Sequence, residues 1–104
     1  MATFLISYRM PVDYQPVVDG VSDRWKAWFQ SLGPAVTTIG NPVTDTAEVG
    51  DCGAGTRLGG YSVITADDRE AALAMVRSCP AAEAGGVEVG LIIEPPGLEE
   101  LRSA

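Results

Sequence analysis

The first residues of the chain alternate between apolar and polar side chains in the manner of a β-strand with one buried face. The alternation runs from Thr3 to Met10, and Pro11 ends it. Its apolar side consists of Phe4, Ile6, Tyr8 and Met10. We therefore predict a first strand over residues 3–10.

The following segment changes from a period of two to a helical spacing. Apolar residues share one helical face between positions 21 and 32, and Gly33-Pro34 closes the pattern. Turn and capping residues from Asp19 to Ser22 precede it. The predicted apolar face of this helix is Val21, Trp25, Trp28, Phe29 and Leu32.

Two strands and a long connection are predicted next. Residues 35–40 are rich in β-branched side chains and are bounded by the turn signal Asn41-Pro42, and residues 60–66 resemble a strand as well. The glycine-rich segment 41–57 between them is longer than the usual limit of about 12–15 residues for a structureless connection. It is either functional or mobile, unless residues 43–49 extend the hairpin.

A second helix and a last strand complete the pattern. Asp67 and Glu70 have the spacing of a capping box, and Pro80 prevents the helix from continuing. The last strand covers residues 87–94, and Pro95-Pro96 ends it. The buried stripe of the second helix is predicted to be Ala72, Met75, Val76 and Cys79.

The resulting order is strand, helix, strand, strand, helix, strand, which is typical of the ferredoxin-like α+β fold. In this fold a four-stranded antiparallel sheet carries two helices on one face. A chain of 104 residues makes one domain, because a second core would leave each half too small to be stable. We predict a single domain over residues 1–96 and a tail over residues 97–104, which has room for one helical turn.

The sheet face away from the helices is predicted to be partly apolar. The alternation assigns to the helix side the apolar set of the first strand together with Tyr61, Val63, Val87, Val89, Leu91 and Ile93. It leaves on the opposite side Leu5, Ile64 and Ile92, among Ser7, Arg9, Ser62, Glu88 and Glu94. Exposing three large aliphatic side chains forgoes about 1.5–3 kcal/mol each, so we expect this face to be covered.

The simplest cover is a second copy of the chain related by two-fold symmetry, which gives a homodimer with two facing sheets and a barrel-like shape. The polar residues Ser7, Arg9, Ser62 and Glu88 would then border a mostly apolar cavity suited to a small molecule. The alternative is that they surround a solvated sheet edge, since isolated exposed aliphatic residues are common.

Charge and composition narrow the classes of partner. Seven basic and 14 acidic residues give a net charge of −7, which disfavours nucleic acid and anionic membranes. Strand-like residues 1–9 lack the layout of a signal peptide, and we expect a cytoplasmic protein. Two cysteines, Cys52 and Cys79, are expected to be free thiols, and no metal site or cofactor is predicted.

Several motifs of the second half together resemble the YCII-related family, which includes relatives named for an Asp-Gly-Pro-Phe motif. They are Leu58-Gly59-Gly60-Tyr61, the Ala66-Asp67-Asp68 cap, the helix end Cys79-Pro80 and the strand entry Gly85-Gly86-x-Glu88-Val89. The N-terminal half agrees in pattern only, through its strand, its Trp-rich helix and the turn Gly40-Asn41-Pro42. The resemblance implies a dimeric α+β barrel, and it implies small-molecule binding with proton transfer or elimination as the reaction.

The chain departs from that family where chemistry is concerned. Some members carry a histidine on the first helix and an aspartate before the proline that ends the second, a pair proposed to act in acid/base chemistry. This chain has no histidine, and Cys79 stands at the position of that aspartate. The Asp-Gly-Pro-Phe motif is also absent, and residues around Asp51-Cys52-Gly53 occupy its region.

Six residues are candidates for contacting a ligand. Arg9 could bind a carboxylate or enolate with its planar donors, or could form an ion pair with Glu88 or Glu94. Asp13 is either a general base or a solvated turn residue. The remaining candidates for the cavity are Ser7, Trp28, Tyr61 and Glu88.

The aromatic candidates have a structural alternative. Tyr61 could donate a hydrogen bond to a ligand, although the alternation places its ring in the helix-facing core with its hydroxyl at the rim. Trp25 and Trp28 are three positions apart and cannot both point fully inward, so one of them could line a pocket mouth or a dimer contact. Cys79, at a helix C-terminus, is expected to be structural.

Two hypotheses of function follow. In the first, a homodimer binds a small, partly apolar metabolite between its sheets and acts on it by proton transfer or elimination. In the second, the barrel is filled by side chains, and the protein is a non-catalytic interaction or accessory module. The absence of histidine favours the second, and the family resemblance favours the first.

Overall fold

A computed structural model describes residues 1–15 and 20–103. The fold is α+β with a four-stranded antiparallel sheet in the order β2-β3-β1-β4, which confirms the predicted ferredoxin-like arrangement. The strands are β1 (Ala2–Pro11), β2 (Val36–Thr38), β3 (Thr56–Ala66) and β4 (Gly86–Leu91). The helices are α1 (Asp23–Leu32), α2 (Arg69–Val76), α3 (Pro80–Ala84) and α4 (Leu98–Arg102), with a 3-10 turn η1 (Gly33–Ala35) after α1.

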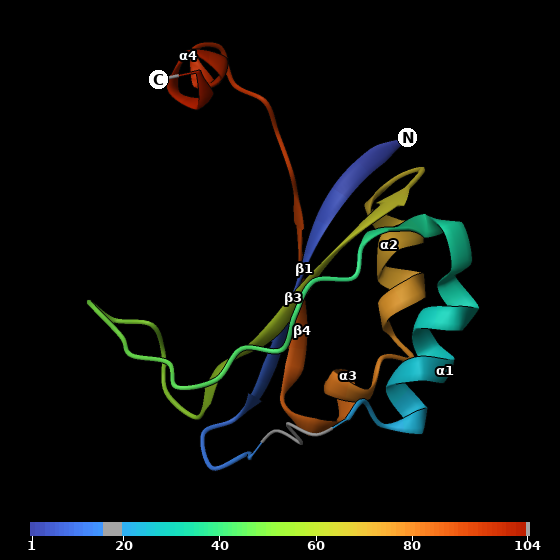
Figure 1. Ribbon diagram of the computed structural model, residues 1–104, viewed down its shortest axis with the longest axis vertical. Helices are drawn as coiled ribbons and strands as arrows, with labels where there is room; N and C mark the ends of the chain where they lie inside the picture. The colour runs from blue at the N-terminus through green and yellow to red at the C-terminus, as the bar shows by residue number, and fades with distance from the viewer. Residues whose placement is uncertain (16–19, 104) are drawn as a thin grey trace.

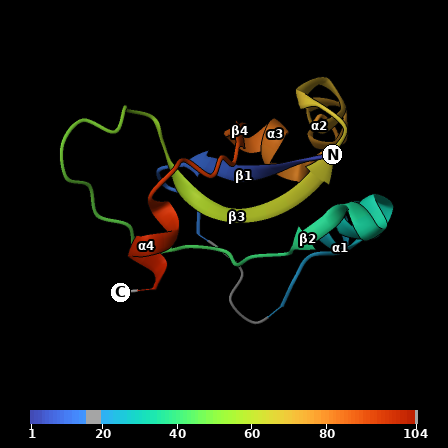
Figure 2. The same cartoon turned by 90° about the horizontal axis from the view of Figure 1, so that it is seen from above.

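Three of the helices lie on one side of the sheet. Figure 1 shows α1, α2 and α3 against this side, and Figure 2 shows the same arrangement from above. The core between these helices and the sheet contains the apolar side of β1, as predicted. Its buried members are Phe4, Ile6, Tyr8, Met10, Trp28, Ile64, Ala66, Ala72, Val76, Cys79 and Ala81.

The predicted orientation of β3 is wrong. Ile6 pairs with Ser62 and Phe4 pairs with Ile64, so both β3 residues face the helices and are fully buried. Tyr61 pairs with Ser7 and therefore lies on the opposite face. The physical reason is that the burial of Ser62 carries no penalty, because its hydroxyl finds two hydrogen-bond partners in the core.

Local sequence explains where the helices begin. Ser22 caps α1, and its hydroxyl accepts a hydrogen bond from the Trp25 N–H. The predicted contribution of Asp19 lies outside the described residues. At α2 the cap is Asp68 rather than the predicted Asp67, and its carboxylate accepts the Ala71 N–H at 2.8 Å.

The strand boundaries differ from the prediction at the sheet edges. β2 covers only three residues, and after the single bridge between Pro42 and Gly60 the connection stays irregular up to Thr56. The predicted second helix ends earlier than Cys79-Pro80, since α2 stops at Val76. Cys79, predicted at the C-terminus of that helix, is instead the N-cap of α3, which Pro80 opens because proline suits the first position of a helix. Alternation alone contains no signal for this five-residue helix.

Two segments extend away from the body on the side of the sheet opposite α1, α2 and α3. They are the connection 41–55 and the C-terminal segment 92–103 with α4 (Figures 1 and 2). The radius of gyration is 14.9 Å, compared with about 13 Å for a compact domain of this length. The uncovered face of the sheet therefore lies between two projections.

Candidate functional site

The uncovered sheet face carries three large side chains that are exposed to solvent. Leu5 is 40% exposed, Tyr61 37% and Ile92 41%. The Ile92 N–H donates to the Thr3 carbonyl oxygen, which continues the β4 pairing and places Ile92 on the same face as Leu5. Leu5 and Ile92 confirm the prediction of an apolar face, whereas Ile64 is buried on the helix side.

Three of the predicted ligand-contacting residues form one row across this face. Ser7 of β1 pairs with Tyr61 of β3 on one side and with Glu88 of β4 on the other. Directly opposed residues of antiparallel strands have Cβ atoms about 4.5–5.5 Å apart. The hydroxyls of Ser7 and Tyr61 and the carboxylate of Glu88 are thus presented together.

Arg9 lies beside that row and is tied to β3. Its Nε donates to the Thr56 Oγ1 at 3.3 Å and its Nη2 to the Thr56 carbonyl at 3.1 Å. Neither Glu88 nor Glu94 lies within ion-pair distance of it, and the ion pairs among residues 1–15 and 20–103 are Arg24–Glu83 and Arg102–Glu94. Asp13 is exposed in the turn after β1, and it does not join the row.

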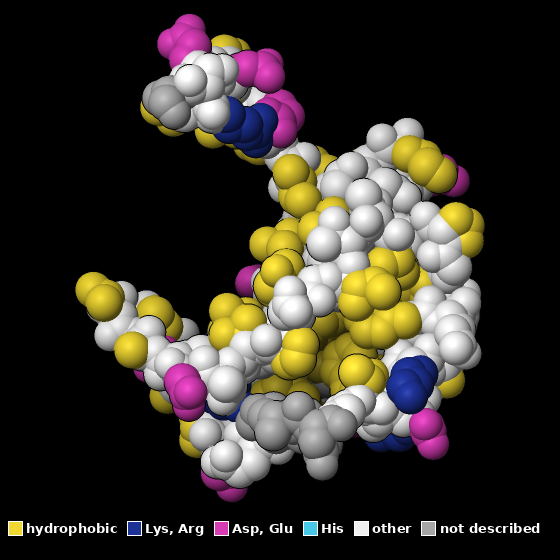
Figure 3. Space-filling model, in the orientation of Figure 1, with side chains coloured by type: hydrophobic (Ala, Val, Ile, Leu, Met, Phe, Trp, Pro, Cys, Tyr) yellow, Lys and Arg dark blue, Asp and Glu magenta, His cyan; other side chains and the backbone are white. Residues whose placement is uncertain are grey.

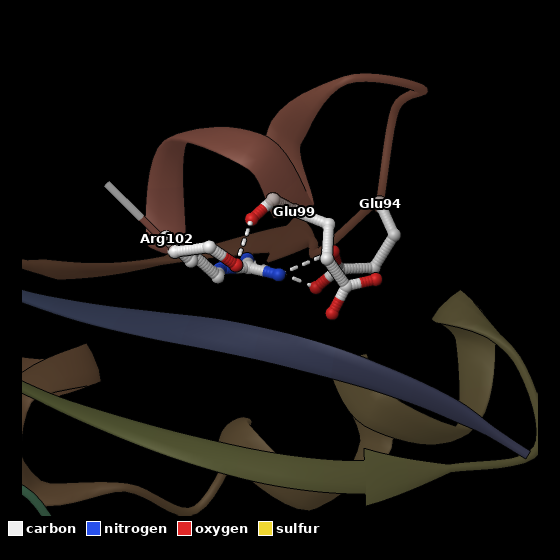
Figure 4. A network of polar contacts seen from close by, with 4 residues as sticks. Glu94, Glu99 and Arg102 are labelled. Atoms are coloured by element: carbon white, nitrogen blue, oxygen red, sulfur yellow. Dashed lines mark hydrogen bonds and ion pairs between the residues drawn. The ribbon is translucent and has the colours of Figure 1, made fainter.

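The C-terminal projection is braced by an ion pair. Arg102 of α4 binds both carboxylate oxygens of Glu94, at 2.6 and 3.0 Å (Figure 4). The hydrogen bonds from Arg102 hold the pKa of the Glu94 carboxyl below its ordinary value. Figure 3 shows the open side of the molecule as a hollow between this projection and the connection 41–55, with hydrophobic side chains along its floor.

A separate pocket of about 600 Å³ opens on the helix side, between α1 and the segment that follows β2. Figure 3 shows a recess with hydrophobic walls there. Its apolar walls include residues of α1, β1, the turn after β1 and the segment 39–42, among them Tyr8, Met10, Tyr14, Trp25, Phe29, Ile39 and Pro42. Its polar lining includes Ser22, Lys26, Gln30 and Asn41.

Aromatic rings dominate the wall on the α1 side. Trp25 stacks on Phe29 with ring centroids 5.9 Å apart, and it meets the Tyr8 ring edge to face at 4.9 Å. Trp28 lies behind them, buried in the core, and its indole Nε1 donates to the Met75 carbonyl at 3.1 Å. Of the two tryptophans, Trp25 therefore lines the pocket.

A chain of buried hydroxyls lies at the inner end of this wall. Tyr8 donates to the Ser62 hydroxyl at 2.7 Å, and Ser62 donates to the Ile39 carbonyl. Burial raises the pKa of the Tyr8 phenol well above its ordinary value, and this outweighs the opposing effect of the hydrogen bond to Ser62. Tyr8 therefore stays protonated at neutral pH.

A second, polar hollow of about 580 Å³ lies under the connection 41–55. The Arg57 guanidinium forms part of it and donates to the backbone carbonyls of Tyr14 and Val43. Because Asp45 and Glu48 also line this hollow, it combines both signs of charge and has little preference for a charged ligand.

The two cysteines lie in different surroundings. Cys79 is buried between α2 and α3, and burial raises the pKa of its thiol. Cys52 is exposed in the connection 41–55. Within the described ranges, no group of three His, Cys, Asp or Glu residues is placed to hold a metal ion.

The structure thus brings together Ser7, Tyr61 and Glu88, with Arg9 beside them, but not Asp13 or Trp28. Sequence reasoning missed the aromatic pocket, because its walls come from segments about 50 residues apart in the chain. The available signal was the spacing of Trp25 and Phe29 at i and i+4, which places both rings on one helical face. Periodicity could not show that β1 and residues 39–42 complete the enclosure.

A comparison with protein families gives one result for this chain. A family model described as YCII-related domain matches residues 1–95. No curated protein and no solved structure gives a significant match. In the part of the chain that the structure describes, no helix has the length and apolar character needed to cross a membrane.

Proposed function

The chain belongs to the YCII-related family, and on that premise we propose that it works as a homodimer that binds a small, partly apolar molecule. The observation that carries the dimer is an excess of exposed surface. The chain exposes 7147 Å², whereas a monomeric protein of its mass exposes about 5,600 Å². The excess of about 1,500 Å² is more than the ~800 Å² that each partner buries in a standard interface.

The uncovered sheet face supplies the apolar centre of this interface. Full burial of a large aliphatic side chain contributes about 1.5–3 kcal/mol. Leu5 and Ile92 each retain about two fifths of their exposure, so covering them contributes roughly 1 kcal/mol per side chain. In a two-fold dimer both copies bury these side chains, so each contribution to the free energy of association occurs twice. Residues 41–55 and α4 would extend around the second copy.

We place the ligand in the aromatic pocket beside α1. Its volume of about 600 Å³ lies within the ~300–1,000 Å³ usual for ligand sites, and such sites combine apolar walls with a few polar groups. Ser7, Arg9 and Glu88 would then belong to the dimer interface. Tyr61 would belong to both, since it lies on the open face and lines the pocket as well.

The chemistry of the pocket suits binding better than proton transfer. A general base needs a pKa near the working pH, and the raised pKa of the Tyr8 phenol moves it away from that range. The chain also lacks the histidine that is paired with an aspartate in some family members. We therefore assign the pocket a binding role.

Sedimentation equilibrium tests the dimer. The wild-type chain of 10.9 kDa should sediment at twice that mass at micromolar concentration. Leu5→Glu places a carboxylate at the centre of the open face and should give monomers. Ala74→Glu adds the same charge on the exposed side of α2 and should leave the dimer intact. A wild-type monomer at these concentrations would overturn the proposal.

A thermal-shift titration tests the pocket with naphthalene-2-methanol as the probe. Phe29→Ala removes part of the pocket wall and should reduce the shift. Met75→Ala removes a half-buried side chain that packs against the same core outside the pocket, and it should leave the shift unchanged. Equal shifts in the two variants would contradict binding at the pocket.

A further inference from the structure

We infer that the ligand of the aromatic pocket is a planar aromatic anion, such as an aryl carboxylate, whose ring lies against Trp25 and Phe29 and whose charge lies near Lys26. This inference rests on the proposed function, because it specifies the ligand of the same pocket. It is carried by the arrangement of charge and of rings in the lining.

Among the described residues of this pocket, the charge is positive only. Among the described residues that line it, the one charged at neutral pH is Lys26, and no carboxylate contributes. Acidic residues outnumber basic residues by two to one in the chain, yet the charged residue that the described lining presents here is a cation. Lys26 is also the only lysine of the sequence.

The fold places Lys26 next to the rings. It follows Trp25 directly on α1 and lies three positions before Phe29, which brings its side chain toward the same side of the helix as the stacked pair. Its backbone N–H donates to the Ser22 carbonyl in the first turn of α1. Arg24, two positions earlier, instead forms an ion pair with Glu83 of α3.

Aromatic walls select planar ligands. A ring that enters the pocket can take the offset or edge-on positions that the side chains Trp25, Phe29 and Tyr8 already adopt among themselves. The neutral polar groups of Ser22, Gln30 and Asn41 in the lining can bind the remaining oxygen atoms of a carboxylate. The net charge of −7 disfavours anions in general, so the local cation is needed for an anion to be accepted.

Calorimetric titration with a matched pair of probes tests this inference. Naphthalene-2-carboxylate and naphthalene-2-methanol share a ring system and differ in charge. Because Lys26 is exposed, we expect the carboxylate to bind about three- to fivefold more tightly at low salt. Lys26→Gln should remove this preference, and Lys26→Arg should retain it. Arg24→Gln removes a positive charge from the same helix outside the pocket and should leave the preference intact.

Chemical protection gives an independent measurement. Apart from the N-terminal amine, Lys26 carries the only primary amine of the chain, so its acetylation can be followed by mass spectrometry of one peptide. The carboxylate probe should slow this reaction more than the alcohol does at equal occupancy.

The outcomes separate the two proposals. Equal binding of the two probes, unchanged in Lys26→Gln, would overturn the preference for anions and leave the pocket as an aromatic site. Absence of binding by both probes would overturn the pocket itself and this inference with it.

Discussion

Replacement of Ser62 by alanine tests whether the buried hydroxyl chain holds the pocket wall together. The Ser62 side chain is fully buried, accepts the Tyr8 hydroxyl and donates to the Ile39 carbonyl. The substitution removes the middle member and leaves a donor and an acceptor without their partners. A buried polar group that loses its partner costs about 1–3 kcal/mol.

The Tyr8 hydroxyl and the Ile39 carbonyl lose different amounts of free energy when Ser62 is removed. The hydrogen bond between Tyr8 and Ser62 is buried, whereas the one from Ser62 to the Ile39 carbonyl is partly buried and Ile39 itself is 62% exposed, so water replaces the lost partner more readily at Ile39. Most of the loss therefore comes from Tyr8, and we expect Ser62→Ala to lower the free energy of unfolding by about 2 kcal/mol. This corresponds to a decrease in Tm of roughly 10 °C for a domain of this size.

A double-mutant cycle in urea, followed by circular dichroism at a fixed protomer concentration, measures the coupling. Tyr8→Phe removes the donor, so Ser62→Ala should cost only about 1 kcal/mol in that background. Ser31→Ala is the control, because its hydroxyl donates to the Trp28 carbonyl at an exposed position, and it should change stability by less than about 0.5 kcal/mol. Additivity of the two core substitutions within about 0.3 kcal/mol would refute the reasoning.

Three further changes have outcomes that the structure specifies. Asp68→Ala removes the cap of α2 and should cost about 1 kcal/mol in thermal unfolding, while Asp67→Ala should be close to neutral. Gly40 has φ +74°, and a Cβ there would lie 1.9 Å from a β3 carbonyl oxygen, so Gly40→Ala should lower the free energy of unfolding, measured in urea, by more than about 1 kcal/mol. The pKa of Glu94 is lower in the folded chain, so its ion pair stabilises above the ordinary carboxyl pKa and is lost as the pH falls through the folded value. Arg102→Gln should return the Glu94 pKa toward its ordinary value in an NMR titration, and an unchanged titration would contradict the bidentate pair.

Those parts of the fold that rest on local periodicity could be predicted from the sequence. The alternation of β1 and the helical spacing of Trp25, Trp28 and Phe29 each specify an element and its buried side. The order of strands and helices along the chain then restricts the sheet to a few possible strand orders. The observed strand order is the ferredoxin-like one.

The orientation of β3 could not be obtained in this way. Residues 60–66 carry apolar side chains on both sides, so the alternation that assigned Tyr61 to the helix side is a weak signal there. The orientation is set by pairing with β1, in which Ile6 opposes Ser62. Tyr8 of β1 donates the hydrogen bond that allows Ser62 to be buried. Such a compensating contact between residues 54 positions apart leaves no local pattern.

The candidate site was predicted only in part, because some of its contacts also join residues that are distant in the sequence. Ser7, Tyr61 and Glu88 form one row because they share a register across three strands. Arg9 lies beside them because it follows Ser7 by two residues on β1. The partner of Arg9 depends on the start of β3, which lies four residues earlier than its sequence pattern indicates. Thr56 therefore takes the position that a glutamate was expected to occupy.

In the proposed homodimer, the uncovered sheet face would link the stability of this chain to its abundance. If a second protomer covers this face, the folded state depends on mass action, so the melting temperature should rise with the concentration of the chain. Dilution would return Leu5 and Ile92 to water without altering a single intramolecular contact. Copy number in the cell would then act as a regulator of folding, in addition to any effector that occupies the aromatic pocket.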